Sequence, residues 1–230
     1  MKLSKRLELV ASFVPRGSRV ADVGTDHGYI PIHLVEEGIC REALALDVRE
    51  GPLARAAAHI REKGLEDRIG LRKSDGLKAL VPGEADTAVI AGMGGQLVIH
   101  ILEEGRHMWD SICTWILSPQ SELDKVRHYL EEEGFAICRE AMVFDEGKYY
   151  TVMEVKRGKM HYEKPSEYLY GRELIQRQDP VLLDYLQQEK NRILGILEGL
   201  NGQKGMGAES AAKELTRQLE TIKEAVYAMQ

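Results

Sequence analysis

Short apolar runs alternate with amphipathic stretches over the first 134 residues of the chain. Most of these runs end in a charged residue or a glycine, and the stretch that follows has apolar residues at helical spacing. This order is typical of parallel strands that are buried on both faces and joined by helices. We therefore expect strands at 19–23, 42–48, 68–73, 86–91 and 112–117. The helices expected around them are 3–13, 30–37, 51–63, 96–104 and 121–132, the last with Ser121 as its N-cap.

The alternation stops after residue 134. Two runs rich in β-branched and aromatic residues, 135–144 and 149–156, are joined by Asp145-Glu-Gly-Lys148, which leaves no room for a helix. Strands with so short a connection form an antiparallel hairpin. The first part of the chain is therefore predicted to be an α/β domain, with a sheet of mostly parallel strands that ends in an antiparallel hairpin.

The composition changes after Gly158, and we expect domains at 1–158 and 159–230. Beyond this point, two segments carry apolar residues at three- and four-residue spacing, separated by a glycine-rich loop at 201–207. The apolar residues are Leu183, Leu186, Ile193, Leu197 and Leu200, then Leu215, Leu219, Ile222, Val226 and Met229. This pattern predicts an antiparallel helical hairpin of the coiled-coil type. This hairpin could be an intramolecular extension, a binding site for a partner macromolecule or a dimerisation surface. Lys190 within the first seam disfavours an interface that excludes water completely.

Composition excludes several classes of protein. With 230 residues, 43% of them hydrophobic and 30% charged, the chain resembles ordinary globular proteins, and no apolar run approaches the length needed to cross a bilayer. The charged N-terminal segment lacks the apolar core of a signal peptide, so we expect a cytoplasmic protein, with a monomer favoured. Cys40, Cys113 and Cys138 have no metal-ligand spacing and are expected to be buried structural thiols, with no bound metal.

Charge is unevenly distributed. The formal net charge of −6 argues against a protein that coats nucleic acid non-specifically. The first 19 residues are nevertheless basic, since five cations against one acid give +4. These residues are Lys2, Lys5, Arg6, Arg16 and Arg19 against Glu8. Such a segment beside a catalytic site would suit a polyanionic substrate, and the alternative is a solvated helix face that happens to be basic.

Acidic residues and glycines, in two cases with a neighbouring threonine or methionine, lie at the carboxyl ends of four of the predicted strands. Ligands of open parallel sheets bind beyond the carboxyl ends of the strands, near the point where the strand order reverses. In chain order, these residues are Asp22, Gly24 and Thr25, then Asp47, then Asp75 and Gly76, and finally Gly92 and Met93. Each signal alone is weak, but four of them in order at one sheet edge predict a binding site.

The chemistry of these residues suits a nucleoside. Asp47 is placed to accept both hydroxyls of a ribose. Asp75 can accept an adenine amino group, and Gly76 lets the ring lie flat on the chain. Gly24 lets a ligand approach the backbone, while Asp22 can hold the loop or, through water, a ligand amine. Asp47, Asp75 and Gly76 thus suit an adenine nucleoside, and Asp22 suits an amino group in another part of the same ligand.

The turn after the first strand distinguishes between two nucleoside cofactors. Dinucleotide sites need G-x-G-x-x-G, whereas this chain reads Gly24-Thr-Asp-His-Gly28, with Asp26 in place of the second glycine. A carboxylate there would repel a pyrophosphate but tolerates a cationic sulfonium and an ammonium group. The backbone at 92–93 can also run close to a sulfonium. The turn therefore favours S-adenosylmethionine over NAD.

Two motifs carry a resemblance to a known family. The segments Asp22-Val-Gly-Thr-Asp-His-Gly-Tyr-Ile-Pro31 and Ala91-Gly-Met-Gly-Gly95, followed by a helical hairpin, resemble the bacterial tRNA (adenine-22-N1)-methyltransferase family. That family lies within the class I methyltransferases, which have a Rossmann-like sheet and use S-adenosylmethionine. The resemblance covers nearly the whole chain and implies methyl transfer to N1 of adenine 22 in tRNA. Where the family often has Gln-Pro-Asn, this chain has Ser118-Pro-Gln120.

The acceptor atom limits which residues the chemistry needs. Enzymes that methylate an exocyclic amine usually carry an Asn/Asp-Pro-Pro-aromatic turn after the fourth strand, and methylation at pyrimidine C5 needs a nucleophilic cysteine. Adenine N1 needs neither, because its lone pair is already nucleophilic, so positioning should dominate.

Three residues of the first turn are the catalytic candidates: Asp26, His27 and Tyr29. Asp26 or His27 could stabilise the charge that spreads to N6, and Tyr29 could stack on an extruded base. The alternative is structural: Asp26 caps the next helix, His27 is a loop residue and Tyr29 packs beneath the turn. The remaining histidines considered have no metal-ligand spacing and are expected at the surface or in helix packing; they are His33, His59, His100 and His107.

Three other functions fit parts of the sequence. A methyltransferase of the same fold could act on a small molecule or a protein, although neither substrate would need the helical hairpin and the basic N-terminus. A nucleotide-binding oxidoreductase is disfavoured by Asp26 and by the antiparallel hairpin. A non-catalytic tRNA-binding module could retain only the cofactor pocket.

Overall fold

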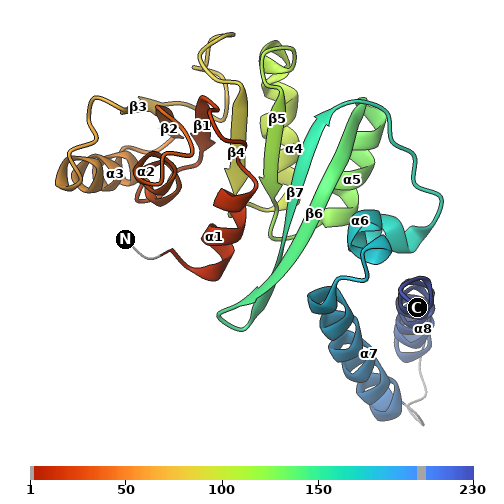
Figure 1. Cartoon of the computed structure of the whole chain (residues 1–230). Helices are drawn as coiled ribbons and strands as arrows, with labels where there is room; N and C mark the ends of the chain where they lie inside the picture. Colours follow the sequence, from red (N-terminus) through yellow and green to blue (C-terminus); the bar gives the residue numbers. More distant parts are fainter. Residues whose placement is uncertain (1–2, 201–205) are drawn as a thin grey trace. The chain divides into compact units, whose positions relative to one another are not determined.

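The computed structural model in Figure 1 describes residues 3–200 and 206–230. The chain divides into two compact units, residues 1–160 and 161–230. The strands of the first unit are β1 (Val20–Val23), β2 (Ala43–Asp47), β3 (Ile69–Lys73), β4 (Thr87–Ala91), β5 (Thr114–Ser118), β6 (Phe135–Asp145) and β7 (Lys148–Arg157). Its helices are α1 (Lys5–Ser12), α2 (Tyr29–Glu36), α3 (Glu50–Glu62), α4 (Gly95–Glu104), the 3₁₀ turn η1 (Arg106–Met108) and α5 (Leu123–Glu132).

One seven-stranded sheet forms the centre of this unit, in the order β3-β2-β1-β4-β5-β7-β6. The first five strands in this order are parallel, whereas β7 is antiparallel to both β5 and β6. The predicted α/β sheet with a terminal hairpin is therefore confirmed. The chain runs outward from β1 to β3 and then returns to β4 on the other side of β1. The strand order reverses between β1 and β4, so their carboxyl ends mark the expected ligand site.

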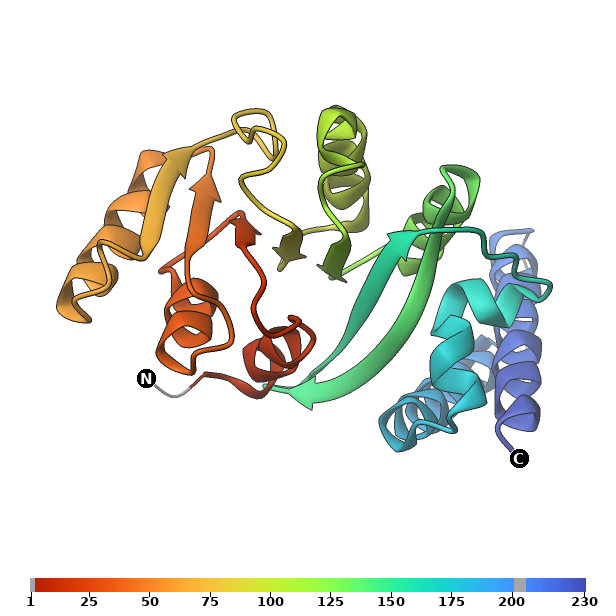
Figure 2. The same cartoon turned by 45° about the horizontal axis from the view of Figure 1, so that its top comes forward.

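Helices cover both faces of the sheet (Figure 2). On one face, α1, α2 and α3 bury apolar side chains such as Val10, Ile32 and Ile60 against the strands. On the other face, α4 and α5 pack against each other. Since both faces are covered, the central strands β1, β4 and β5 are almost completely buried, which explains why they read as continuous apolar runs.

The β6–β7 hairpin extends beyond the sheet that it closes. β5 pairs only with residues 153–155 of β7, whereas β6 and β7 pair with each other along nearly their whole length. Helix α1 packs against the outer part of the hairpin, and the N–H of Arg6 donates to Asp145 Oδ2 at 3.0 Å. The first helix and the end of the hairpin are thus joined beside the carboxyl ends of the parallel strands.

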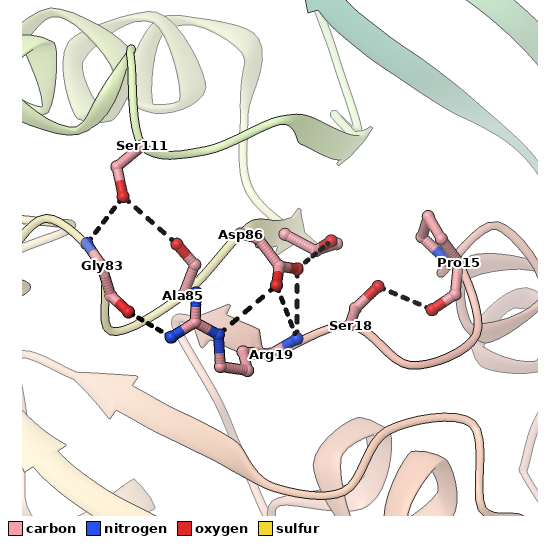
Figure 3. Close-up of polar contacts among 8 residues, drawn as sticks. Pro15, Ser18, Arg19, Gly83, Ala85, Asp86 and Ser111 are labelled. Carbon is pink, nitrogen blue, oxygen red and sulfur yellow. Dashed lines mark hydrogen bonds and ion pairs between the residues drawn. The ribbon is translucent and has the colours of Figure 1, made fainter.

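A polar network fixes the opposite, amino-terminal edge of the sheet (Figure 3). The N–H of Arg19 donates to the carboxylate of Asp86 just before β4, and the Arg19 guanidinium contacts the same carboxylate and the carbonyl of Gly83. Ser111, which precedes β5, accepts from the N–H of Gly83 at 2.8 Å. Arg19 therefore holds strand entries in place and lies away from the predicted catalytic edge, which corrects its assignment to a basic patch there.

Two local expectations are wrong. Ser121 does not cap α5: the helix begins at Leu123, and the Ser121 hydroxyl accepts the N–H of Gly95 at 3.4 Å. Of the three cysteines only Cys40 is buried. Cys113 directly precedes β5, and Cys138 lies at the irregularity where β6 shifts register against β7, so neither side chain is held in the core.

The second unit is helical. It contains the π-helical turn η2 (Glu167–Gly171), α6 (Arg172–Gln176), α7 (Pro180–Leu200) and α8 (Met206–Ala228). The two long helices pack together and bury residues that include Leu186, Ile193 and Ile222, as the two apolar seams predict. The first seam begins at Leu182, however, while Leu183 is 45% exposed. Most of the predicted loop, 201–205, lies outside the described residues, and 206–207 belong to α8.

In the part of the chain that the structure describes, none of the helices is both long enough and apolar enough to span a membrane. Nor do its histidines, cysteines and acidic residues form a cluster of three or more that could hold a metal ion.

Candidate active site

Two adjoining cavities open at the carboxyl ends of the parallel strands. The first, which we call the β3-side cavity, measures about 400 Å³ and reaches toward the ends of β2 and β3. The second, the α1-side cavity, measures about 320 Å³ and reaches toward α1 and β5. Gly24, Asp26, Ala91 and Gly92 line both of them. These shared residues lie at the ends of β1 and β4, where the strand order reverses.

The predicted cofactor-binding residues divide between the two cavities. Those that line the β3-side cavity are Gly24, Asp47, Asp75, Gly76, Gly92 and Met93. Asp22 and Thr25 line the α1-side cavity, together with the shared residues Gly24 and Gly92. All eight residues therefore line one or both of two adjoining cavities. The three catalytic candidates, Asp26, His27 and Tyr29, also line the α1-side cavity.

Glycines leave room for a ligand along this edge. Gly24 has a φ of +76°, and the N–H groups of Gly24 and Thr25 both donate to the carbonyl of Leu46 at the end of β2. A Cβ at Gly24 would collide with the terminal methyl of Met93. Gly92 also has a positive φ, of +81°. The turns after β1 and β4 thus approach each other closely, with only the Met93 side chain against Gly24.

Asp22 is a buried acid at the end of β1, with 6% of its surface exposed. Burial raises its pKa to about 6, the Thr25 hydroxyl lowers the pKa in part, and the charge of Asp47 raises it. No lysine, arginine or histidine of the described chain forms an ion pair with Asp22. The carboxylate would therefore be stabilised by a cationic group of a ligand.

The other two acids have partners already. Asp47 is 7% exposed, and its Oδ1 accepts the N–H of Arg49 at 2.7 Å, which shapes the turn after β2. Asp75 is exposed and accepts from Lys78 Nζ at 2.7 Å, and this hydrogen bond lowers the pKa of the Asp75 carboxyl. Each of these carboxyl groups still has an oxygen that can accept a ligand hydrogen bond.

Helix α3 holds the turn that carries the catalytic candidates. Arg55 donates to the Asp26 carboxylate, and this hydrogen bond lowers the pKa of Asp26. One turn later, His59 Nδ1 lies 2.9 Å from the carbonyl oxygen of His27. A Cβ at Gly28 would lie 3.2 Å from Ala56 Cβ, so the turn packs directly on α3. Asp26 does not cap α2, whose N-cap is Gly28.

Three aromatic rings stack along this turn. The His27 and Tyr29 rings lie 5.0 Å apart with 14° between their planes, and the His59 ring lies 5.4 Å from His27 and 5.5 Å from Tyr29. His27 has a φ of +68°, an uncommon value for a residue with a side chain. The stack and the His59 hydrogen bond together hold His27 in this conformation.

Sequence reasoning missed four residues at this site. Arg55 and His59 lie on one face of α3, and their four-residue spacing on an alanine-rich helix was the available signal. Arg6 was counted only as part of a basic segment, and Gln120 was left without a role. Both line the α1-side cavity, and Gln120 is fixed there because its N–H donates to the carbonyl of Met93 at 2.8 Å.

Comparisons with known proteins place the chain among the methyltransferases. Residues 3–153 match the family model described as a methyltransferase domain. A tRNA (adenine(22)-N(1))-methyltransferase of Bacillus subtilis is 32% identical over 236 aligned positions, which cover 98% of both chains. The chain belongs to the tRNA (adenine-22-N1)-methyltransferase family.

Solved structures of this family have the same fold. The B. subtilis m1A22 tRNA methyltransferase is 32% identical, with a TM-score of 0.84 over 98% of this chain and 99% of that one. Sp1610 of Streptococcus pneumoniae, solved in complex with S-adenosyl-L-methionine, is 35% identical, with a TM-score of 0.87 over 97% and 99% of the two chains. These comparisons confirm, over nearly the whole chain, the family resemblance that the two sequence motifs indicated.

Proposed function

We propose that this protein transfers a methyl group from S-adenosylmethionine to N1 of adenine 22 in tRNA. The observation that carries the proposal is the pair of adjoining cavities where the strand order reverses. Acids and glycines suited to the cofactor lie on one side, and an acid with stacked rings lies on the other. The family membership of the chain supports both the cofactor and the substrate.

The residues of the β3-side cavity fit the nucleoside of the cofactor. Asp47 would accept the ribose hydroxyls and Asp75 the adenine amino group, with the ring lying flat on Gly76. The positive φ values of Gly24 and Gly92 leave the backbone open to the sulfur region, where the Met93 side chain also lies. When bound, the cofactor supplies an electrophilic methyl group on its sulfonium.

The α1-side cavity fits the amino-acid end of the cofactor and the acceptor base. Asp22 and Thr25 would receive the ammonium group, whose positive charge favours the ionised form of a carboxyl with a raised pKa. Tyr29 and His27 would offer a ring surface to an extruded adenine. The N1 lone pair needs no general base, so the contribution of the chain is to hold the ring in line with the methyl group.

Asp26 would stabilise the product side of the reaction. Methylation at N1 leaves a positive charge that spreads to N6, and an ionised carboxylate near N6 accepts a hydrogen bond from it. Arg55 keeps Asp26 ionised, and 61% of the side chain is exposed toward solvent, so the carboxylate can reach a base that enters the cavity. His27, the next residue in the same turn, would help to stabilise this charge at N6.

The rest of the chain is proposed to support this reaction. We assign residues 1–158 to the methyltransferase domain and 159–230 to a helical domain that contacts the tRNA or another partner. We place the protein in the cytoplasm as a monomer.

A methyl-transfer assay tests the proposal. Purified protein is incubated with radiolabelled S-adenosylmethionine and unmodified tRNA, and the RNA is digested to nucleosides. We expect the label in 1-methyladenosine. Label in N6-methyladenosine or in a pyrimidine, or label in protein and none in RNA, would contradict the proposed acceptor.

A further inference from the structure

His59, on helix α3, contacts the turn that carries the catalytic candidates, although it lines neither of the two cavities. Its Nδ1 lies 2.9 Å from the carbonyl oxygen of His27. A carbonyl oxygen can only accept a hydrogen bond, so the proton of this bond belongs to His59 Nδ1. The His59 ring also stacks with the rings of His27 and Tyr29. A single side chain of α3 therefore contacts both the backbone and the rings of the turn.

The backbone of this turn has a conformation that needs such support. His27 has a φ of +68°, and Gly28, the next residue, also has a φ of +68°. Glycine adopts such left-handed angles freely, whereas a residue with a side chain keeps them only where neighbouring contacts hold it. These two residues set the direction of the chain between Asp26 and Tyr29. The conformation of His27 therefore decides how Asp26 and Tyr29 lie relative to each other.

The side chain of His27 adds little to this support. Its Nδ1 is buried and has no hydrogen-bond partner in the described part of the chain. Its Nε2 lies 3.6 Å from Asp26 Oδ2, which is longer than a hydrogen bond. Among the described residues, the bond from His59 is also the one hydrogen bond to the backbone of His27. The left-handed conformation of His27 thus depends mainly on His59.

Helix α3 is a firm base for this contact. It packs against β2 and β3, and its Ala56 is completely buried. A Cβ at Gly28 would lie 3.2 Å from Ala56 Cβ, so the backbone of the turn lies directly on the helix. The four-residue spacing of Arg55 and His59 places both on the face of α3 that meets the turn. The helix can therefore hold the turn before any substrate binds.

We propose that His59 is a positioning residue for methyl transfer: its hydrogen bond to the His27 carbonyl holds the turn in the conformation that presents Asp26 and the rings to the adenine. This inference rests on the proposed function and adds a residue behind the acceptor site. The orientation of the base toward the methyl group governs the rate. Losing the hydrogen bond should therefore slow methyl transfer without weakening cofactor binding.

Nuclear magnetic resonance tests the hydrogen bond without any RNA. Long-range proton–nitrogen spectra of protein with isotope-labelled histidine distinguish a ring nitrogen that carries a proton from one that does not. At about pH 8, where an ordinary histidine is neutral, we expect the proton of His59 on Nδ1. The signals of His59 are assigned by their loss in His59→Asn. A proton on Nε2 and none on Nδ1 would show that the bond to His27 does not form, and would overturn the proposal.

Two variants separate the hydrogen bond from the ring. His59→Phe keeps an aromatic ring but has no donor, whereas His59→Asn has no ring but places an amide N–H close to the position of Nδ1. We expect His59→Phe to lower kcat for tRNA methylation by roughly tenfold, the effect of leaving one acceptor unpaired. His59→Asn should keep kcat within about threefold of the unchanged protein, because it keeps the bond. Affinity for S-adenosylhomocysteine should stay within about twofold in both variants, which also shows that they are folded.

His107→Phe is the matched control. His107 Nε2 lies 3.1 Å from the carbonyl oxygen of Leu80, which is the same kind of contact, and His107 lines neither cavity. Losing this contact should affect folding stability in a similar way but leave kcat unchanged. The comparison separates an effect on the reaction from an effect on folding.

Three kinetic results would overturn the proposal. Unchanged kcat in His59→Phe would show that the turn needs no support from His59. Equal losses of kcat in His59→Phe and His59→Asn would assign the effect to the ring rather than to the hydrogen bond. A loss of S-adenosylhomocysteine affinity as large as the loss of kcat would show a general disturbance of the fold. Failure of the unchanged protein to methylate tRNA would instead refute the proposed function, and the spectra would still decide whether the hydrogen bond exists.

Discussion

Asp26 shows how one residue can be located from sequence while its partner cannot. The departure from a dinucleotide motif identified Asp26 as unusual, and the structure places it at the junction of the two cavities. Its contact with Arg55 depends on how α3 packs against the first turn, 29 residues away along the chain. No spacing rule within the turn itself could give that contact.

Replacing the Asp26 charge tests its catalytic role. Asp26→Asn keeps the shape of the side chain but removes the negative charge that would stabilise methylated adenine. We expect kcat for tRNA methylation to fall by roughly 10- to 100-fold, with S-adenosylhomocysteine affinity within about threefold of the unchanged protein. Asp67→Asn, at an exposed acid away from both cavities, is the matched control and should be silent. Unchanged kcat in Asp26→Asn would remove Asp26 from the mechanism.

Asp22 gives the ligand-free protein a pH-dependent stability. Its pKa is raised from 3.8 to about 6 in the folded chain, so the folded state binds the proton more tightly than the unfolded state. Stability from this group is therefore present below about pH 4 and is lost as the pH rises to about 6. Asp22→Asn removes this loss. Urea unfolding should show the variant gaining stability relative to the unchanged protein between pH 4 and pH 7, by up to about 3 kcal/mol.

A different pH dependence of stability would contradict the prediction for Asp22. A stability difference between the two proteins that stays constant from pH 4 to pH 7 would show that Asp22 titrates normally. Ligand binding should have the opposite trend, because an ammonium group favours the ionised carboxylate. Affinity for S-adenosylhomocysteine should rise as the pH passes through 6.

At the scale of elements, the buried strands were predictable and the helix faces less so. The apolar runs gave β1, β2, β4 and β5 within one or two residues, because strands buried on both faces leave little choice of residue type. The exposed helices were harder to read. Helix α7 buries Leu182 rather than Leu183, a shift of one position that a 3,4 spacing tolerates.

We expect cofactor binding to depend on the turn after β1. Gly24→Ala adds a Cβ that meets the terminal methyl of Met93 at a φ of +76°. The Met93 methyl can move aside, so the added Cβ should mainly occupy space that the ligand needs. We expect calorimetry to show an affinity for S-adenosylhomocysteine lowered by roughly tenfold or more, which is about the effect of losing one hydrogen bond to a charged group.

Gly17→Ala is the matched control for Gly24→Ala. Gly17 has a similar φ of +84°, but no atom lies within 4 Å of an added Cβ. Both variants should lose similar stability from the backbone conformation, about 1 kcal/mol. Only Gly24→Ala should lose affinity. Equal affinities in the two variants would show that the close approach at Gly24 does not serve the ligand.

At the scale of the whole molecule, the site is assembled from segments that are far apart in sequence. The strand ends could be listed in order because parallel strands bring their carboxyl ends to one edge. Arg6 and Gln120 could not be placed in this way, since their positions depend on α1 packing against the β6–β7 hairpin and on the link between Gln120 and Met93. The basic N-terminal segment accordingly splits, with Arg6 at the site and Arg19 at the opposite edge of the sheet.

The central claim concerns one atom of one nucleotide, and a pair of tRNA transcripts tests it most directly. The two transcripts are identical except that adenine 22 in one is guanine in the other, and both are incubated with the protein and radiolabelled S-adenosylmethionine. The account predicts about one methyl group per molecule in the first transcript, recovered as 1-methyladenosine, and background incorporation in the second. Equal incorporation into both transcripts would contradict it.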